Sequence, residues 1–212
     1  MTMEINTLFP TVLGITKIQE SESIKKKFAN KIINKFKTDR NLKAPWAEYS
    51  NTWQTHAELI DEDLFKLFYT HFQESVHKWF EVFNLPPIHY RPVMWVNVHT
   101  YEMYQDTHAH DGHGCILCGN YNLKLNQEDR PTQFTADRLY ESLLCQAGVV
   151  AQSPFLTACS NDVVDIAEGD LVLFSPDLKH CVPCAKKKHD EHRITLSFNI
   201  EVVPASTSVH PV

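Results

Sequence analysis

The stretch that decides the fold of this chain reads EGDLVLFSPDLKHCVP and runs from residue 168 to residue 183. Gly169-Asp170 is typical of a turn, and the apolar run from Leu171 to Phe174 is typical of a short buried strand. Ser175-Pro176-Asp177 then predicts a second turn. His180 is therefore expected just beyond a tight corner, where a new strand begins.

A second stretch, RITLSFNI at residues 193–200, alternates between apolar and polar side chains. This period of two indicates a strand with one face in a core and a polar face on the opposite side. The apolar face would carry Ile194, Leu196, Phe198 and Ile200, and the polar face would carry Arg193, Thr195, Ser197 and Asn199. The polar face therefore begins with a guanidinium group.

Composition limits the class of protein. The chain has 212 residues, 43% of them hydrophobic and 22% charged, which predicts one globular domain over residues 1–212. A formal net charge of -6 with scattered lysines argues against a nucleic-acid partner, because phosphate binding needs a basic surface. No apolar run is long enough to span a bilayer, so we expect no membrane partner and a cytoplasmic location. The oligomeric state stays open, a homodimer included.

The N-terminal part, residues 1–91, is predicted to be mainly helical. Its aromatic residues recur at helical spacing, which is more typical of a core stripe than of a cofactor site. Residues 41–54 show no clear period and are expected to be irregular. The expected elements are an edge strand at residues 5–15 interrupted by Pro10, a helix at 20–36 capped by Ser21 or Ser23, and a helix from Ala57 or Asp61 to Phe83.

Residues 92–204 are predicted as a β core. Short strand-like runs recur there, and helices followed by many short strands indicate a jelly-roll barrel with helices packed on it. Residues 126–161 give only weak signals and are expected to form an insertion, either a lid or a surface loop. The expected strands are residues 93–99, 115–125, 163–166, 171–174, 180–182 and 193–202.

Histidine is the unusual residue type. There are twelve, and His108, His110 and His113 fall within six residues. A non-haem iron site holds its cation through three side chains on one face, usually two histidines and a carboxylate. Two ligands from one strand must be two residues apart to point the same way, which His108 and His110 satisfy. His180 would be the third ligand.

The motifs around these histidines resemble the iron(II)- and 2-oxoglutarate-dependent oxygenases, in particular members common in marine phages and bacteria. The resemblance is at the level of motifs and covers roughly residues 5–15 and 93–202. It implies a double-stranded β-helix and, as cofactors, Fe(II) and 2-oxoglutarate. The residues that carry it are LFPTV at 8–12, WVNVH at 95–99, YEM at 101–103, HAH at 108–110 and GNYNL at 119–123.

One departure from that family concerns the metal ligands. The family usually has His-x-Asp, and His110 stands in the place of the aspartate. Three interpretations are open: a site of three histidines, a site that uses Asp111, or His110 as a residue outside the ligand set. The spacing favours His108, His110 and His180 as the metal ligands.

The same resemblance implies the cosubstrate residues. An arginine on the last strand of the fold binds the far carboxylate of 2-oxoglutarate, and Arg193 takes that position here. Its planar fork suits a carboxylate, and Thr195 would point the same way and add a hydrogen bond. Tyr121 is a weaker candidate for the same carboxylate. No side chain is assigned to acid–base or nucleophilic catalysis.

Two Cys-x-x-Cys pairs offer a rival site. Cys115 and Cys118 form the first pair and Cys181 and Cys184 the second, and four such thiols are typical of a structural zinc site. A zinc-stabilised binding module is therefore one alternative. Against it, residues three apart on a strand point to opposite faces. Cys145 and Cys159 are predicted to be plain buried thiols.

The resemblance implies hydroxylation of an amino-acid side chain, in the manner of a prolyl hydroxylase, on a peptide, a protein or a small molecule. The sequence itself does not specify the substrate. A second alternative is a cupin-type dioxygenase that works without 2-oxoglutarate, which a three-histidine site would suit and which would not need Arg193.

Overall fold

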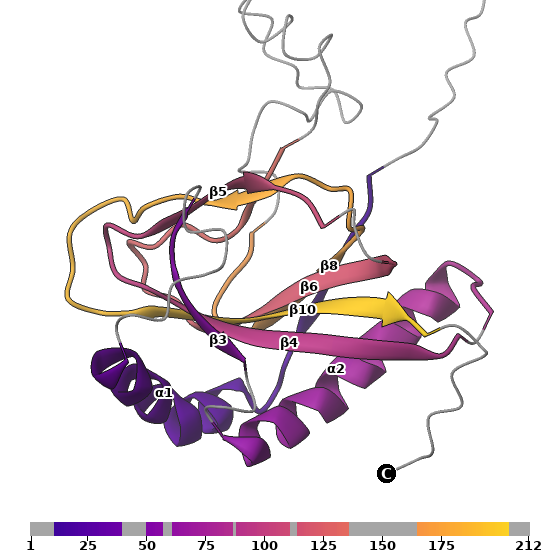
Figure 1. Ribbon diagram of the computed structural model, residues 1–212, viewed down its shortest axis with the longest axis horizontal. Coiled ribbons are helices and arrows are strands. Elements are labelled where there is room, and N and C mark those ends of the chain that lie inside the picture. Colours follow the sequence, from indigo (N-terminus) through magenta and orange to yellow (C-terminus); the bar gives the residue numbers. More distant parts are fainter. Residues whose placement is uncertain are drawn as a thin grey trace, which may run out of the picture.

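The computed structural model describes residues 11–39, 50–56, 61–86, 88–110, 114–135 and 165–203. In these ranges two helices and ten strands occur, and every strand pairing is antiparallel. The strands form a larger sheet and a smaller sheet that face each other, and both helices lie beneath the larger one (Figure 1).

The two helices are amphipathic and bury one stripe each. Helix α1 spans Ser21–Thr38 and helix α2 spans Glu62–Val82. The Asp61 side chain caps α2 by accepting hydrogen bonds from the backbone N–H groups of Asp63 and Leu64. The buried stripes repeat every four residues, as one helical face requires: Ile24, Phe28, Ile32 and Phe36 on α1, and Leu64, Phe68, Phe72, Val76 and Phe80 on α2.

Among the described residues, the larger sheet has six strands and packs on the two helices. Its strand order is β1-β8-β6-β10-β4-β3. The central strands are long, at ten residues each, and β10 pairs with both β4 and β6. The strands are β1 (Leu13–Lys17), β8 (Asp170–Phe174), β6 (Cys115–Lys124), β10 (Arg193–Val202), β4 (Tyr90–His99) and β3 (Trp53–His56).

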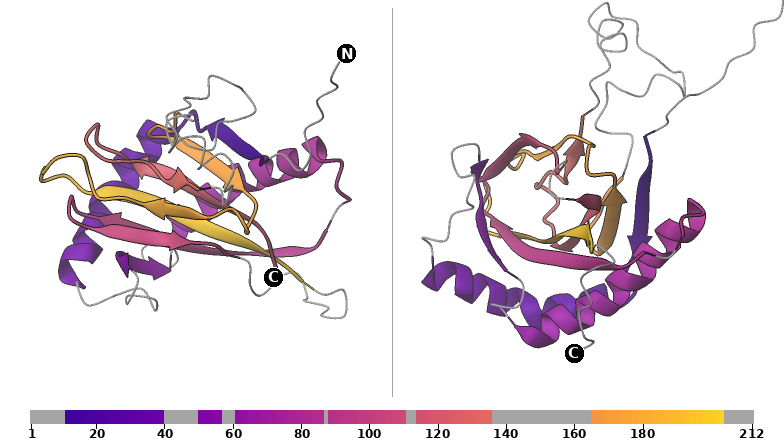
Figure 2. Two further views of the ribbon diagram at one scale, coloured as in Figure 1. Left: turned by 90° about the horizontal axis from the view of Figure 1, so that it is seen from above. Right: turned by 45° about the vertical axis from the view of Figure 1, so that its right-hand side comes forward.

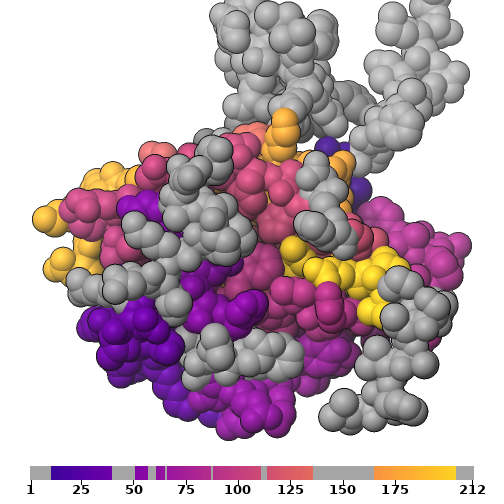
Figure 3. All heavy atoms as spheres, in the orientation of Figure 1, coloured from indigo at the N-terminus to yellow at the C-terminus, as the bar shows by residue number. Residues whose placement is uncertain are grey.

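The smaller sheet has the order β2-β5-β9-β7 and is built from short strands. These are β2 (Ser50–Asn51), β5 (Tyr104–His108), β9 (His180–Val182) and β7 (Gln133–Phe134). Viewed from the side, the two sheets curve around a common interior, with the helices outside it (Figure 2). The space-filling view shows α1 and α2 as one continuous layer along the lower side (Figure 3).

The two faces of the larger sheet have different chemistry. The helix side is an apolar core that contains Met94, Val96, Leu196 and Phe198. Gly119 is part of this packing, because a Cβ there would lie 2.2 Å from the ring of Phe198 and 2.4 Å from the carbonyl oxygen of Val172. The opposite face is rich in polar side chains, including Asn97, Asn120, Thr195 and Ser197. The alternation in β4 and β10 thus separates a core from a polar interior.

Most of the predicted elements are present. The ranges 180–182 and 193–202 are strands as expected, and α2 begins after Asp61, the second of the two predicted starts. The predicted Ser cap of α1 is wrong, since Glu20 precedes the helix and Ser21 is already helical. The expectation of an irregular stretch up to residue 54 is also wrong, because β2 and the start of β3 lie there. They are held in place by pairing with β5 and β4, respectively, which are distant in the sequence.

Other predictions fall on residues that the structure does not describe, among them Pro10, residues 41–49 and residues 136–161 of the insertion. Residues 133–134, which were assigned to that insertion, form β7. Residues 165 and 166 are not in a strand, although a strand was expected at 163–166. Neither described helix combines the length and apolarity that crossing a membrane requires. The single-domain assignment stays a prediction.

Candidate metal centre

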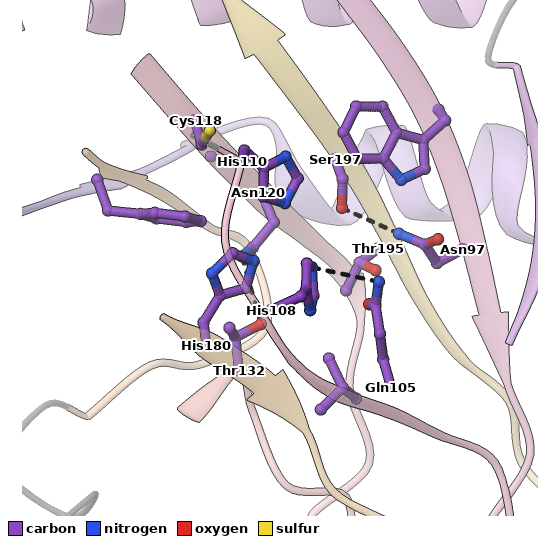
Figure 4. A pocket seen from close by; sticks show the side chains of 14 residues that line it. Asn97, Gln105, His108, His110, Cys118, Asn120, Thr132, His180, Thr195 and Ser197 are labelled. Atoms are coloured by element: carbon purple, nitrogen blue, oxygen red, sulfur yellow. Dashed lines mark hydrogen bonds between the residues drawn. The ribbon is translucent and has the colours of Figure 1, made fainter. Parts of the chain in front are cut away.

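Three histidines meet between the two sheets. His108 ends β5 and pairs across the smaller sheet with His180, the first residue of β9; His110 follows two residues after His108. One ring nitrogen from each lies within 4.8 Å of the others. Within the described ranges, no other group of three or more His, Cys, Asp and Glu residues is arranged to hold a metal ion. Figure 4 shows the three rings pointing toward one another.

Each imidazole is oriented by an oxygen atom on its far side. Nδ1 of His108 lies 2.8 Å from the Asp106 carbonyl oxygen, and Nδ1 of His180 lies 2.9 Å from that of Leu178. Nδ1 of His110 lies 2.8 Å from Oδ1 of Asn199 on β10. Because these oxygens only accept hydrogen bonds, each Nδ1 carries the proton and each Nε2 carries the lone pair. This is the arrangement that fixes histidine ligands around a metal.

The surroundings keep two of these rings, those of His108 and His180, neutral. Burial, together with the neighbouring His108 ring, lowers the pKa of His180 from 6.5 to about 3. Burial also lowers the pKa of His108. Metal ligation requires the neutral imidazole, so both rings are in the ligand form at neutral pH. The cluster therefore brings three ring nitrogens together, and two of its rings have the protonation state that metal ligation requires.

Asn199 was not assigned a role from the sequence, yet it holds His110. We expect Asn199→Ala to weaken Co²⁺ or Fe²⁺ binding by about tenfold, because loss of a partner that orients a ligand typically weakens metal affinity by about 10- to 100-fold. Asn199→Asp should retain most of the affinity, since a carboxylate oxygen can still accept from His110. Isothermal titration of the metal into each variant measures the difference. Equal affinity in Asn199→Ala and the original protein would contradict this role.

The structure bears on the three interpretations of the ligand set. It brings His110 into the cluster with His108 and His180, as the two-residue spacing predicts. Asp111 and His113 lie outside the described residues. That these three histidines bind a metal stays a prediction, which the variants described in the Discussion test.

A cavity opens beside the histidines. Strands β4 and β10 form one wall, with Trp95, Asn97, Thr195 and Ser197, and Asn97 donates to Ser197 over 2.9 Å. Several buried polar atoms of the lining have no hydrogen-bond partner among the residues that the structure describes, namely Trp95 Nε1, Asn97 Oδ1 and Asn120 Oδ1. Buried polar groups are rarely left unsatisfied, so this lining suits a polar ligand. Sequence periodicity placed Ser197 on the polar face of its strand without assigning it to the site.

Arg193 lies fully buried at the start of β10. Its guanidinium donates to the carbonyl oxygen of Arg130 over 2.8 Å and to the hydroxyl of Thr132 over 3.3 Å, while its Nε has no hydrogen-bond partner in the described part of the chain. Burial lowers the pKa of Arg193 to about 10, so the group is still cationic at neutral pH. Thr132 and Thr195 both line the cavity. Arg193 itself is not among the residues that line the cavity; its guanidinium adjoins the cavity wall through the hydrogen bond to Thr132.

His99 is a buried histidine that sequence analysis left without a role. It stands opposite Arg193 in the pairing of β4 with β10, and its Nε2 lies 3.0 Å from the Thr52 hydroxyl. Burial, followed by the charge of Arg193, lowers the pKa of His99 from 6.5 to about 3. The ring is therefore neutral in the folded protein and becomes protonated in the unfolded chain below pH 6.5.

This difference predicts that stability falls as the pH drops from 6.5 towards 3. At pH 5, His99 is protonated in the unfolded chain but neutral in the folded protein. From this group alone, the free energy of unfolding at pH 5 should therefore be about 2 kcal/mol lower than at pH 7.5. Urea unfolding at pH 7.5 and pH 5 measures the total. His99→Gln should show a smaller pH dependence, whereas His77→Gln, an exposed position on α2, should keep it. An unchanged pH dependence in His99→Gln would contradict the assignment.

Tyr121 does not reach the cavity. It alternates with Asn120 on β6 and points to the helix side, where its ring lies 5.1 Å from that of Phe68. Burial raises the pKa of its hydroxyl. The structure therefore gives Tyr121 the role of a core aromatic residue and not the position of a cosubstrate ligand.

The four thiols of the Cys-x-x-Cys pairs do not assemble. Cys115 and Cys118 are close together, but Cys184 is exposed and donates to the carbonyl oxygen of Glu102. All four are described, and no group of three or more metal-ligand side chains includes any of them. The zinc-module alternative is therefore not supported. Cys145 and Cys159 lie outside the described residues.

Two facing antiparallel sheets with a histidine cluster and a buried arginine between them define a jelly-roll protein with a candidate metal centre. The sequence profile of a family described as putative 2OG-Fe(II) oxygenase matches residues 93–199, half of the chain. The chain belongs to this family. Among proteins with curated functions, none matches the sequence.

Solved structures show the same fold. A prolyl-4-hydroxylase from Pseudomonas putida matches with a TM-score of 0.64 at 9% identity, covering 92% of this chain and 94% of its own. A prolyl hydroxylase from Trichoplax adhaerens, in complex with a hypoxia inducible factor peptide fragment, matches with 0.59 at 11%, covering 90% and 83%. HygX from Streptomyces hygroscopicus, with nickel and 2-oxoglutarate bound, matches with 0.54 at 12%, covering 91% and 83%. The predicted jelly-roll core is confirmed; the likeness to phage and marine-bacterial members stays a prediction.

Proposed function

We propose that this protein is an iron(II)- and 2-oxoglutarate-dependent dioxygenase that hydroxylates an amino-acid side chain. The observation that carries the proposal is the cluster of His108, His110 and His180, in which each Nδ1 is hydrogen-bonded to an oxygen atom. A buried Arg193 in the same interior supports the choice of a dicarboxylate as cosubstrate. Membership of the oxygenase family agrees with both features.

The residues present fit both groups. Three Nε2 lone pairs suit Fe(II), and three protein ligands leave coordination positions for a cosubstrate and oxygen. When bound, iron and 2-oxoglutarate supply the oxidation of a C–H bond. His108, His110 and His180 would hold the metal, and Arg193 with Thr195 would hold the far carboxylate of the cosubstrate.

The chain's own contribution is orientation and exclusion of water. Asn199, Asp106 and Leu178 orient the imidazole rings through their Nδ1 atoms before any metal binds. A carboxylate of the cosubstrate would pair with the Nε–H of Arg193, which has no partner among the described residues, and would compete with Arg130 and Thr132 for the terminal N–H groups. The burial of Arg193 strengthens such a charge-assisted pair, because few water molecules compete for it.

For the substrate we propose a peptide or protein with an accessible side chain, proline first, and a small molecule second. Two of the structures with the same fold are named prolyl hydroxylases, and one of those holds a peptide. Another structure of HygX holds hygromycin B, a small molecule, at a TM-score of 0.53. Since these proteins share only the fold with this chain, their names suggest which substrates to test first.

The test begins with cosubstrate turnover. Purified protein receives Fe(II) and 2-oxoglutarate without oxygen, and the visible charge-transfer absorption of the chelate is recorded. Oxygen is then admitted with a set of proline-containing peptides, and succinate and hydroxyproline are measured. Absorption together with substrate-dependent succinate supports the proposal. Absence of the band in a protein that binds Fe(II) would rule out 2-oxoglutarate as the cosubstrate.

A second candidate is a cupin-type dioxygenase that does not use 2-oxoglutarate. Two observations favour it: the described cluster contains three histidines without a carboxylate, and Arg193 is already bonded within the protein. This enzyme would bind Fe(II) but would show no dependence on 2-oxoglutarate. Oxygen consumption with and without 2-oxoglutarate separates the two candidates.

A further inference from the structure

A β-bulge brings Cys115 beside Cys118. In the pairing of β6 with β10, Cys118 faces Asn199 and Leu117 faces Ile200, but Glu201 pairs with Cys115 and Ile116 is skipped. On a regular strand these two cysteines would point to opposite faces. The extra residue turns Cys115 toward Cys118, and the two Sγ atoms lie 3.4 Å apart.

The two thiols differ in their access to solvent. Cys115 is partly exposed near the end of the strand, whereas Cys118 is 1% exposed and lines the cavity beside the histidines. The hydrogen bond from Cys118 lowers the pKa of Cys115, while the neighbouring Cys115 and burial raise that of Cys118. A more acidic, reachable thiol next to a buried one is the arrangement found in peroxide-sensitive cysteine pairs.

We propose that Cys115 and Cys118 are a reversible oxidation site that a peroxide converts into a disulfide. The Cys115 thiolate attacks one oxygen of hydrogen peroxide, which breaks the O–O bond and leaves a sulfenic acid on Cys115 and a hydroxide ion. The Cys118 thiol then attacks the Cys115 sulfur and releases water. In total, two thiols lose two hydrogen atoms and one peroxide becomes two water molecules. The sulfur atoms must approach from 3.4 Å to about 2.0 Å.

The pair is also linked to the candidate metal centre. The Cys118 thiol lies 3.4 Å from Oδ1 of Asn199, the same oxygen that accepts from Nδ1 of His110. Because a thiol has one proton, the Cys118 S–H donates either to Asn199 or to Cys115 Sγ at any moment. A disulfide has no S–H, so oxidation removes this donor and draws Cys118 toward Cys115. On the basis of the proposed function, we infer that oxidation weakens metal binding by about tenfold, the lower end of the effect of disturbing a ligand's partner.

The first experiment tests the disulfide alone, on the full metal-free chain. Protein treated with hydrogen peroxide is alkylated, digested with trypsin and mapped by mass spectrometry; Cys115 and Cys118 share one peptide that contains no other cysteine. We expect that peptide to lose two hydrogen atoms and to recover them with dithiothreitol. Cys115→Ser should abolish the change, and Cys184→Ser, an exposed thiol, should leave it intact. Alkylation of both thiols after peroxide treatment, or a stable sulfinic acid on Cys115, would overturn the proposal.

The second experiment measures Co²⁺ affinity of the reduced and the oxidised protein. An affinity about tenfold lower after oxidation, restored by dithiothreitol that is removed before titration, supports the link through Asn199. A disulfide with unchanged Co²⁺ affinity would overturn the link and leave the oxidation site. Failure of even the reduced protein to bind Co²⁺ or Fe²⁺ would overturn the proposed function and the link together, whereas the mapping of the disulfide does not depend on either.

Discussion

Metal binding is expected to be lost in His180→Ala, with the Kd for Co²⁺ or Fe²⁺ raised by more than about a hundredfold. His180 supplies one of only three nitrogens in the cluster, and altering the partner of a ligand alone already weakens affinity by about 10- to 100-fold. The side chain is buried between the sheets, so a water molecule would have to replace the imidazole. Isothermal titration and metal analysis after dialysis give the measurement.

The matched control is His77→Ala, which removes an exposed histidine from α2 and should leave the Kd unchanged. A parallel series settles the position of the family's carboxylate. If His110 is a ligand, His110→Ala should lose metal strongly, His110→Asp should retain much of it, and Asp111→Ala should bind as the original protein does. Strong loss in Asp111→Ala with retention in His110→Ala would reverse the assignment.

The second large effect is expected in Arg193→Leu, which should weaken 2-oxoglutarate binding by about a hundredfold and leave the metal Kd nearly unchanged. Truncating one partner of a buried charged pair typically loses about 2–5 kcal/mol, and about 1.4 kcal/mol corresponds to a tenfold change. Arg193→Lys should recover only part of the affinity, because an ammonium cannot form the two parallel hydrogen bonds of a guanidinium. Anaerobic titration of 2-oxoglutarate into the Fe(II) protein measures the affinity.

Arg91→Leu is the control for this effect. Arg91 lies on β4 near the other end of the same strand pair, where it is exposed and forms an ion pair with Glu201. Circular dichroism should first confirm that both variants are folded, since Arg193→Leu leaves the Arg130 carbonyl without its side-chain donor and removes one of the two donors to the Thr132 hydroxyl. Full 2-oxoglutarate affinity in a folded Arg193→Leu protein would contradict the role of Arg193 and favour the cupin-type candidate.

Local periodicity was sufficient for much of the fold and for two of the three histidines of the candidate cluster. The alternation in RITLSFNI correctly separated Leu196 and Phe198, which are in the core, from Thr195 and Ser197, which line the cavity. The spacing of His108 and His110 predicted that these two side chains would point the same way, and both are in the cluster. These features depend on residues close together in the sequence or on one strand. The place of His180 was expected from the family resemblance, and it depends on the pairing of β5 with β9.

Other features depend on pairings between distant segments. The bulge that aligns Cys115 with Cys118 arises where β6 pairs with β10. No pattern in the sequence of β6 itself predicts this bulge. The smaller sheet joins two-residue strands such as β2 and β7, which are too short to give a period. The motif suggested Tyr121 as a cosubstrate ligand. Alternation along β6 would have placed it in the core instead, because its neighbours Asn120 and Asn122 are on the polar face.

The unequal size of the two sheets has a mechanical consequence. His108 and His180 belong to strands of five and three residues, whereas His110 is tied by Asn199 to a ten-residue strand with a neighbour on each side. Short strands have few ladder hydrogen bonds and open locally at lower free energy than central ones. A cation bound by these histidines would connect the easily opened smaller sheet to the more stable larger sheet. Amide exchange in β5 and β9 would slow on metal loading, while the central strands of the larger sheet would remain as they are.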